Sequence, residues 1–203
     1  MNYLAIIFWI LLFIVFYGYV GYGLVIWFIN RMKKNKISGK KEKYTPTVTL
    51  LIAAYNELPY LKDKVINCQE LKYPHLKVIF VTDGSTDSSA DFLQNQTGIT
   101  VFHSPERKGK MAAIDRVMPY IDTEITVFTD ANTFLNPEAI SYLIEPFQNP
   151  EVGVVAGEKK IASKKGHTTA AGEGLYWKYE SFLKKEDARF YSTVGAAGEL
   201  YAI

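Results

Sequence analysis

The sequence predicts an α/β fold with a mainly parallel sheet, preceded by one transmembrane helix. An uncharged apolar segment, Tyr3–Ile29, lies near the N-terminus, and short apolar runs alternate with stretches of helical pattern after Pro46. Such runs are typical of strands that are covered on both faces. Strand–helix alternation indicates a mainly parallel sheet with right-handed crossovers.

The N-terminal segment is long enough to cross a membrane. It contains 27 residues without a charge, and about 20 apolar residues span a bilayer as a helix. A cleaved signal peptide has a basic start and an apolar core of about 7–15 residues, which Met1-Asn2-Tyr3 and the long run do not match. The length of the run also disfavours a buried helix of a soluble domain. We therefore expect a transmembrane helix over residues 1–30.

The basic residues are concentrated directly after this segment. The chain has 23 Lys and Arg against 21 Asp and Glu, yet Arg31–Lys43 alone carries a net charge of +6 and Tyr44–Ile203 carries −4. Because positive flanks stay in the cytoplasm, we expect a single-pass protein of the cell (plasma) membrane, with a cytoplasmic linker over residues 31–45 and a cytoplasmic domain over residues 46–203. The basic segment can also attract anionic lipid, but a role in topology alone is favoured.

The composition excludes several classes of protein. A single cysteine excludes a disulfide-stapled scaffold or a multi-cysteine zinc module, and 48% hydrophobic residues exclude wholesale disorder. Cys68 falls in the first predicted helix of the domain, where we expect a buried, reduced thiol. The three histidines show no metal-ligand spacing, and we expect no nucleic acid partner.

The elements of the domain follow from the alternation of apolar and helical patterns. The apolar runs predict strands at Val48–Ala53, Lys77–Thr82, Ile99–His103, Ile125–Thr129 and Val152–Ala156. Helices are expected between them at Tyr60–Leu71, Asp87–Gln96, Lys110–Pro119 and Pro137–Phe147. The last helix has a good start signal, because Pro137 and Glu138 follow Asn136 as a cap.

Polar motifs follow several of these strands, where parallel sheets bind their ligands. Asp83–Asp87 follows the second strand, Asp130–Asn132 follows the fourth, and the basic loop Arg107–Lys110 follows the third. Each motif alone is also typical of a turn or a solvated loop, but their placement together favours a site for an anionic ligand and a divalent cation. The oxygen ligand of Asp130 favours Mg²⁺ or Mn²⁺, and the metal and Lys110 can stabilise a diphosphate leaving group. No Gly-x-Gly-x-x-Gly fingerprint follows a strand, so we expect no dinucleotide site.

Taken together, four motifs resemble family 2 glycosyltransferases, which are related to hyaluronan, cellulose and poly-N-acetylglucosamine synthases. They are Ala53–Glu57 (AAYNE), Asp83–Asp87 (DGSTD), Lys108–Lys110 (KGK) and Asp130–Asn132 (DAN). The resemblance runs from about Pro46 to the chain end and implies a GT-A fold for nucleotide-diphospho-sugars. It implies a membrane-bound hexosyltransferase of polysaccharide biosynthesis. Such an enzyme transfers sugar with inversion from a nucleotide sugar, here expected to be UDP-linked, to a glycan or lipid-linked acceptor.

The resemblance also implies roles for individual residues on the donor side. The residues expected to bind the donor are Tyr55, Glu57, Asp83, Lys110 and Asp130, with Asp83 near the base. Asp130 matches the first aspartate of the family's Asp-x-Asp signature and is expected to bind Mg²⁺ or Mn²⁺. The second position is Asn132, whose amide oxygen can bind a hard cation but contributes no charge.

On the acceptor side, Gly195–Ile203 is similar to the family's acceptor loop and following strand, and Glu173–Lys185 resembles the helix before it. We expect Gly198, Glu199 and Trp177 on this side, although packing of Trp177 against the sheet is favoured over sugar stacking. In the family, the catalytic base is an aspartate downstream of this loop, followed by a Gln-x-x-Arg-Trp motif. We therefore expect the base beyond Ile203 and a domain that is incomplete at its C-terminus.

Two other functions remain open at the level of the sequence. One is a catalytically inactive fragment or accessory membrane protein that keeps the nucleotide-binding fold and works with a partner membrane subunit. The other is a nucleotidyltransferase, which the Asp83–Asp87 loop and the missing glycine-rich loop after the first strand disfavour. The sequence does not identify the sugar, the linkage or the acceptor.

Overall fold

The computed structural model describes residues 2–33, 44–158, 169–192 and 198–203, with the backbone alone for 169–175. The chain forms two compact units. The helical unit comprises Met1–Lys40 and Lys160–Gly195, and the sheet unit comprises Lys41–Lys159 and Ala196–Ile203.

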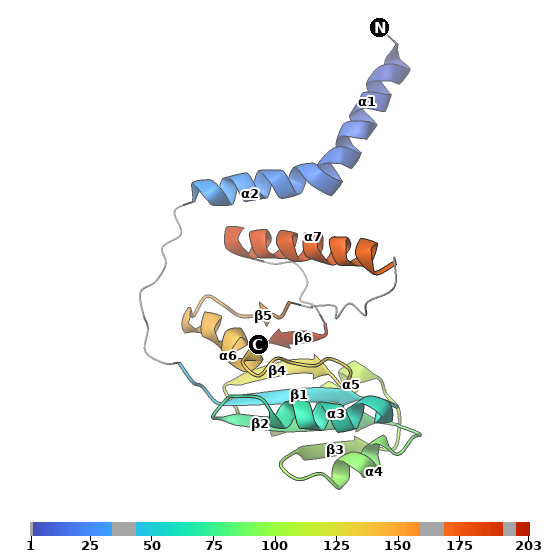
Figure 1. Cartoon of the computed structure of the whole chain (residues 1–203), viewed down its shortest axis with the longest axis vertical. Coiled ribbons are helices and arrows are strands. Elements are labelled where there is room, and N and C mark those ends of the chain that lie inside the picture. The colour runs from blue at the N-terminus through green and yellow to red at the C-terminus, as the bar shows by residue number, and fades with distance from the viewer. Residues whose placement is uncertain (1, 34–43, 159–168, 193–197) are drawn as a thin grey trace. The chain divides into compact units, whose positions relative to one another are not determined.

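Within the described residues, the sheet unit contains one six-stranded sheet in the order β3-β2-β1-β4-β6-β5 (Figure 1). The strands are β1 (Val48–Ala54), β2 (Leu76–Asp83), β3 (Thr100–Ser104), β4 (Ile125–Asp130), β5 (Val155–Ala156) and β6 (Leu200–Ala202). Strands β3, β2, β1 and β4 are parallel, and β6 is antiparallel to both β4 and β5. The predicted mainly parallel sheet is therefore confirmed.

Helices connect the parallel strands as the alternation of patterns predicts. They are α3 (Leu58–Gln69), α4 (Ser89–Gln94) and α5 (Lys110–Val117), while α6 (Ala139–Ile144) follows the last parallel strand, β4. Short 3-10 turns lie at Met118–Tyr120 and Glu145–Gln148. Most boundaries differ from the prediction by one or two residues, and the differences at α6 and β5 have a clear local cause. Helix α6 begins at Ala139 rather than at Pro137, because the Ala139 N–H bonds the Asn136 carbonyl in a turn, and Asn136 is not its cap. Strand β5 has two residues rather than five, because the Val152 N–H closes a turn on Asn149.

Strand β1 shows why its apolar run is continuous. Leu50 and Ile52 face one side of the sheet, where they pack in the cluster that contains Leu61 of α3 and Ile140 of α6. Leu51 faces the other side, in a second cluster with α5. All three β1 side chains are almost completely buried. A strand covered on both faces needs apolar residues at every position, and this centres the sheet within the core.

The helical unit begins with a continuous helix, Tyr3–Met32, which is made of α1 (Tyr3–Phe16), the π-helical segment η1 (Tyr17–Gly21) and α2 (Tyr22–Met32). Its mean hydropathy reaches 2.4 over 18 residues, and among the described residues it is the one helix long and apolar enough to cross a membrane. The helix changes direction at η1 (Figure 1). A π-helical segment is a common cause of such a bend.

Helix α7 (Thr169–Phe190) packs along α2 within the same unit. Gly23 permits this approach, because a Cβ there would lie 3.0 Å from Leu183 Cδ2 and 3.2 Å from Tyr179 Oη. Polar contacts continue along the pair, from Tyr22 Oη, which donates to Asp187 Oδ1 at 2.5 Å, to Asn30. The packing groups α7 with the N-terminal helix, whereas the sequence places it in the domain 46–203. Those domain boundaries stay a prediction, and most of the linker, residues 34–43, lies outside the described residues.

Candidate functional site

A cavity of about 310 Å³ opens where β1, β2 and β4 end. It lies at the point where the strand order departs from β1 in both directions, toward β2 on one side and β4 on the other. Open α/β sheets bind ligands at such a switch point. The lining residues are Ala53, Ala54, Tyr55, Glu57, Val81, Asp83, Arg107, Gly109, Lys110, Ala113, Asp130 and Asn132. The structure thus brings together every residue named for the donor and the metal, while their roles stay predictions.

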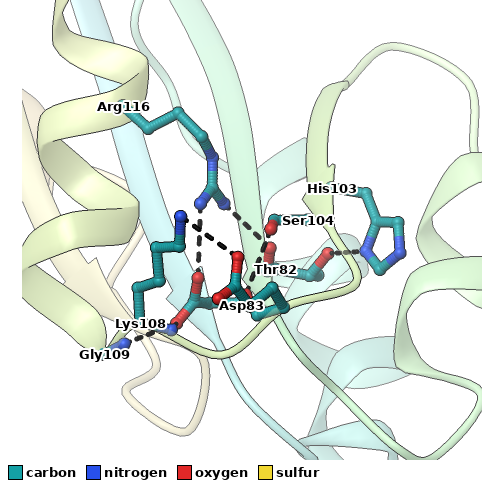
Figure 2. A network of polar contacts seen from close by, with 8 residues as sticks. Thr82, Asp83, His103, Ser104, Lys108, Gly109 and Arg116 are labelled. Carbon is teal, nitrogen blue, oxygen red and sulfur yellow. Dashed lines mark hydrogen bonds and ion pairs between the residues drawn. The ribbon is translucent and has the colours of Figure 1, made fainter.

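Asp83, at the end of β2, is the most firmly held of these side chains (Figure 2). It is 4% exposed, and its Oδ2 accepts hydrogen bonds from the Lys108 and Gly109 N–H groups, at 2.7 Å each. Arg116 lies 3.3 Å from Oδ1 and also donates to the Thr82 carbonyl. Burial raises the pKa of Asp83, but these hydrogen bonds and the arginine outweigh it, so the pKa is below its usual value. Asp83 is therefore an anion that holds the basic loop in place.

The turn after Asp83 needs a glycine for two reasons. Gly84 has a φ of +66°, a left-handed conformation that side chains disfavour. A Cβ at this position would lie 2.6 Å from the Arg107 backbone nitrogen. The Gly84 N–H bonds the Ser104 carbonyl at 2.8 Å, which joins the turn to the end of β3. The second motif and the basic loop therefore pack directly against each other.

The motif after β1 is fastened to the same turn by Asn56. Its Oδ1 accepts from the Thr86 N–H at 2.8 Å, and its Nδ2 donates to Thr86 Oγ1 at 3.1 Å. Next to it, Asp87 Oδ2 accepts from the Leu58 N–H, at the start of α3. Burial raises the pKa of Asp87, but hydrogen bonds from Ser89 and Leu58 lower it overall. Asn56 and Asp87 thus position the loop rather than line the cavity.

Tyr55 and Arg107 form an aromatic and cationic shelf in the cavity. The Arg107 guanidinium carbon lies 3.9 Å from the Tyr55 ring centroid, and Nη1 donates to Tyr55 Oη at 3.1 Å. Stacking of this kind offers a flat surface of matching size to a nucleobase. Arg107 belongs to the basic loop that the sequence identifies, but no role was assigned to it. Arg116 was not identified, because in a sequence a basic helix residue that pairs with a buried carboxylate cannot be told from one that faces solvent.

Asp130, Lys110 and Asn132 line the part of the cavity at the end of β4. Lys110 Nζ forms an ion pair with Asp130 Oδ1. Burial and the charges of Asp130 and Asp87 raise the pKa of Glu57, which lines the same cavity. No group of three or more His, Cys, Asp or Glu that could hold a metal occurs among the described residues. Asp130 and Asn132 offer hard oxygen ligands that fit Mg²⁺ or Mn²⁺ when a diphosphate supplies further ones.

Side chains of α3 hold the loop after Asp130 through hydrogen bonds to its backbone. Lys64 is fully buried, and its Nζ donates to the Thr133 carbonyl. Asn67 donates to the Leu135 carbonyl at 2.7 Å and accepts from its N–H at 2.9 Å. Burial lowers the pKa of Lys64 to about 8. Lys64 was not among the predicted site residues, although a lysine on the apolar stripe of α3, between Leu61 and Cys68, is a signal that could have identified it.

The residues expected on the acceptor side do not line this cavity. Gly198 is exposed in a turn, and the Glu199 carbonyl accepts from Thr129 Oγ1 at 3.0 Å, which ties β6 to β4. Trp177 lies on α7, in the helical unit, in edge-to-face contact with Tyr176. Residues 195–197 of the expected acceptor loop lie outside the described residues. Cys68 is buried and free, and burial raises the pKa of its thiol to about 11, as expected for an inert thiol.

Comparison with known protein families identifies the family of the chain. Residues 49–202 match the model of the family described as Glycosyl transferase family 2. The chain belongs to this family. The match covers the motifs around the cavity, from the start of β1 to β6. The resemblance carried by the four motifs is therefore confirmed.

Curated relatives of known name are longer than this chain. The poly-beta-1,6-N-acetyl-D-glucosamine synthase of Staphylococcus aureus (strain COL) is 31% identical over 122 residues, which cover 58% of this chain and 29% of that protein. The synthase of the same name from Staphylococcus epidermidis is 26% identical over 159 residues, which cover 75% of this chain and 38% of that protein. The chain thus spans well under half the length of the curated relatives it matches.

Solved structures share the fold. The mannosyltransferase PcManGT from Pyrobaculum calidifontis, in complex with GDP-Man and Mn²⁺, has a TM-score of 0.74 at 23% identity and covers 92% of this chain and 53% of that one. TarS 1–349 of S. aureus, in complex with UDP-GlcNAc, has a TM-score of 0.51 at 16% identity and covers 60% of this chain and 37% of that one. At these identities the likeness shows the fold alone, and it confirms the predicted GT-A fold.

Proposed function

We propose that this chain is the anchor and donor-binding part of a membrane-bound glycosyltransferase. It binds a UDP-linked sugar, with Mg²⁺ or Mn²⁺, for transfer with inversion to a glycan or lipid-linked acceptor at the cytoplasmic face of the cell membrane. The observation that carries the proposal is that the cavity at the strand ends brings three features together. They are the stacked Tyr55 and Arg107, the buried Asp83, and the ion pair of Lys110 with Asp130.

The nucleobase part of the donor fits the shelf beside Asp83. A base that stacks on Tyr55 or Arg107 has its polar edge within the reach of the Asp83 carboxylate. That carboxylate accepts from two N–H groups and Arg116, which leaves acceptor capacity toward the cavity. The imino N–H of uracil is a suitable donor to it. The curated relatives are named as synthases of poly-N-acetylglucosamine, and TarS was solved with UDP-GlcNAc, which supports a UDP-linked donor; PcManGT, solved with GDP-Man, makes GDP the competing choice.

The diphosphate part fits the opposite side of the cavity. Lys110 is paired with Asp130 in this structure, and it can exchange that partner for a phosphate oxygen when the donor binds. Asp130 and Asn132 would then hold the divalent cation, which supplies positive charge for the departing diphosphate. Solvent is partly displaced from a cavity of this size, so these charges act more strongly than they do in water.

Transfer itself needs a general base that deprotonates the acceptor hydroxyl, and we assign that role to no described residue. Gly198, Glu199 and Trp177 stay proposed for the acceptor side. Helix Tyr3–Met32 is the proposed membrane anchor, because α1 has no charged residue and none of its side chains is buried. The synthase relatives support a role in polysaccharide biosynthesis.

Titration calorimetry on the full chain in detergent tests the donor site. We expect UDP to bind more tightly with 5 mM Mn²⁺ than without it, and more tightly than GDP. Asp130→Ala should weaken metal-dependent UDP binding by roughly tenfold or more, because it removes the charged metal ligand and the partner of Lys110. Asp115→Ala is the matched control, since Asp115 is exposed on α5 and does not line the cavity.

The outcomes separate the parts of the proposal. No binding of either nucleotide with Mn²⁺ would overturn the donor site. Tighter binding of GDP than of UDP would overturn only the choice of base. Equal losses in Asp130→Ala and Asp115→Ala would show that the cavity does not bind the diphosphate.

A further inference from the structure

A second cavity, of about 280 Å³, lies between α2 and α7 within the helical unit. It is lined by Trp27, Asn30, Arg31, Lys33, Glu186 and Arg189. These residues surround the C-terminal end of the long apolar helix, at the point where its charged residues begin. For the basic residues at this end the sequence favours a role in topology over attraction of anionic lipid, and it predicts no cavity here.

The one acidic side chain of the cavity is already neutralised. Glu186 is 3% exposed, and its Oε1 accepts from Arg189 Nη1 at 2.7 Å. Asn30 Nδ2 donates to Glu186 Oε2 at 2.9 Å and to the Glu186 carbonyl at 2.7 Å. A buried carboxylate that is held in this way fixes the two helices to each other. It is not available as an acceptor for another cation.

Two further cations are held at the mouth of the cavity by neutral groups. The Arg31 guanidinium carbon lies 5.4 Å from the Trp27 ring centroid. Lys33 Nζ donates to the Phe190 carbonyl at 3.0 Å and lies 4.1 Å from the centre of its ring. Within the part of the chain that the structure describes, neither cation forms a salt bridge. The cavity therefore has an excess of two positive charges in a defined geometry.

The surface beside the cavity is apolar. Leu24, Val25 and Phe28 of α2 are exposed. Trp27 lines the cavity and contacts Arg31, and an amphipathic ring of this type favours the headgroup region of a membrane. A ligand that matches both parts has a negatively charged head and an apolar body. A guanidinium group binds phosphate oxygens in a bidentate manner, which makes phosphate the best match for Arg31.

We propose that this cavity binds the phosphate of an anionic phospholipid, with Arg31 and Lys33 as its ligands and the apolar face of α2 against the acyl chains. The proposal rests on the proposed membrane anchoring by Tyr3–Met32. It adds to that anchoring a specific lipid site, which the helical pair creates and which a single isolated helix would lack. Arg189 contributes through Glu186, whose charge it compensates.

The experiment uses the full chain in nanodiscs of phosphatidylcholine that contain 20% phosphatidylglycerol. After gentle transfer to detergent, native mass spectrometry counts the lipids that each chain retains. We expect wild-type protein to retain one phosphatidylglycerol in preference to phosphatidylcholine. The double variant Arg31→Gln/Lys33→Gln should lose about tenfold in retention, and Arg31→Lys should keep part of it. Lys178→Gln is the matched control, because it removes a charge from an exposed position of α7 outside the cavity.

Equal retention in the double variant and in Lys178→Gln would overturn the proposal, as would equal retention of the two lipids by the wild type. Displacement of the retained lipid by 10 mM inorganic phosphate alone would show that the site recognises free phosphate, and this too would overturn a lipid site. Circular dichroism checks that the helices of each variant are intact. Flotation with pure phosphatidylcholine vesicles tests the anchor separately, since failure there contradicts the membrane anchoring and not the lipid preference.

Discussion

Asp83 in the sheet unit and Glu186 in the helical unit are both buried carboxylates paired with an arginine, but their other partners differ. Asp83 accepts from two backbone N–H groups, those of Lys108 and Gly109. Glu186 accepts from the side-chain amide of Asn30. Backbone donors cannot reverse their polarity, whereas an Asn amide can turn over and present its oxygen instead. The first site is therefore fixed in charge and geometry, and the second can adapt.

This difference matches what each region is proposed to do. The cavity beside Asp83 must hold a base and a diphosphate in one orientation, which favours rigid donors. The cavity beside Glu186 is proposed to accept one member of a class of lipids, for which the position of positive charge is sufficient. Matched amide substitutions of the two carboxylates test the comparison directly.

Asp83→Asn should have the largest effect. Whichever way the new amide is turned, its NH₂ group faces either the two backbone N–H groups or Arg116, so that at least one buried donor loses its acceptor. We expect a loss of about 2–3 kcal/mol in the free energy of unfolding, because an unsatisfied buried polar group costs about 1–3 kcal/mol and Arg116 also loses its ion pair. Denaturant unfolding of the full chain in detergent measures it.

UDP binding to Asp83→Asn provides a second measurement. We expect it to weaken by roughly tenfold or more, since the loop that carries Lys110 is no longer held at Asp83. Asp115→Asn, with the same chemical change at an exposed position of α5, serves as the control. Wild-type stability and affinity in Asp83→Asn would contradict a fixed geometry at this site.

Lys64 extends the comparison to a buried cation in the sheet unit. Its pKa is about 8 in the folded state, against 10.5 as its ordinary value, so the folded chain binds fewer protons between these two pH values. Stability therefore rises with pH across that window as far as Lys64 is concerned. Between pH 7 and pH 9.5 the expected gain is about 2 kcal/mol, from about 1.4 kcal/mol for each unit of pKa shift.

Lys64→Met should remove this dependence. The raised pKa values of Cys68 and Tyr73 act in the opposite direction, since both groups lose stability as pH rises through their ordinary values. The quantity to measure is therefore the difference in unfolding free energy between wild type and Lys64→Met at pH 7 and at pH 9.5. Parallel curves for the two proteins would contradict a desolvated Lys64. Lys64→Met also leaves the Thr133 carbonyl without the hydrogen bond from Lys64. A weaker UDP affinity of this variant would show that Lys64 positions the loop after Asp130.

The two regions also differ in how far the sequence predicts them. The strands and the cavity residues were predictable, because β1 shows its burial in a run of apolar residues and the polar motifs follow strand ends. Lys64 and Arg116 were not identified, since a basic residue on a helix gives no sign of the carbonyl or carboxylate it meets in the fold. The pairing of α2 with α7 joins residues 156 positions apart, such as Asn30 and Glu186, and no local pattern encodes it.

Glu186→Gln should have a smaller effect than Asp83→Asn. Asn30 Oδ1 is buried and has no hydrogen-bond partner among the described residues, so a turned Asn30 amide can accept from the new Gln NH₂, although the turn breaks the hydrogen bond from Asn30 Nδ2 to the Glu186 carbonyl. Arg189 can still donate to the remaining oxygen. We expect a loss of about 1–2 kcal/mol, from the ion pair with a half-exposed arginine and from the hydrogen bond to the carbonyl. For a chain of this size that corresponds to a fall of about 2–8 °C in Tm, followed by circular dichroism.

The same variant sharpens the lipid proposal. Removal of the negative charge leaves Arg189 uncompensated, so retention of phosphatidylglycerol should not fall. A Tm loss as large as that of Asp83→Asn would contradict the idea that side-chain partners adapt where backbone partners cannot. The double variant Glu186→Gln/Asn30→Ala removes the adapting partner and should restore the larger loss.

Tyr179→Phe should have the smallest effect, and it tests the π-helical segment. A π-helical turn leaves a carbonyl without its usual intrahelical partner, and Tyr179 Oη of α7 donates to the Tyr19 carbonyl within η1. Loss of this hydrogen bond should cost about 0.5–1.5 kcal/mol, the usual net contribution of one intramolecular hydrogen bond. Thermal unfolding in detergent measures the change. Tyr176→Phe is the matched control, since Tyr176 is an exposed tyrosine of the same helix. Equal Tm values for the two variants would mean that the segment is π-helical for reasons internal to Tyr3–Met32, such as its glycines, and that α7 does not stabilise it.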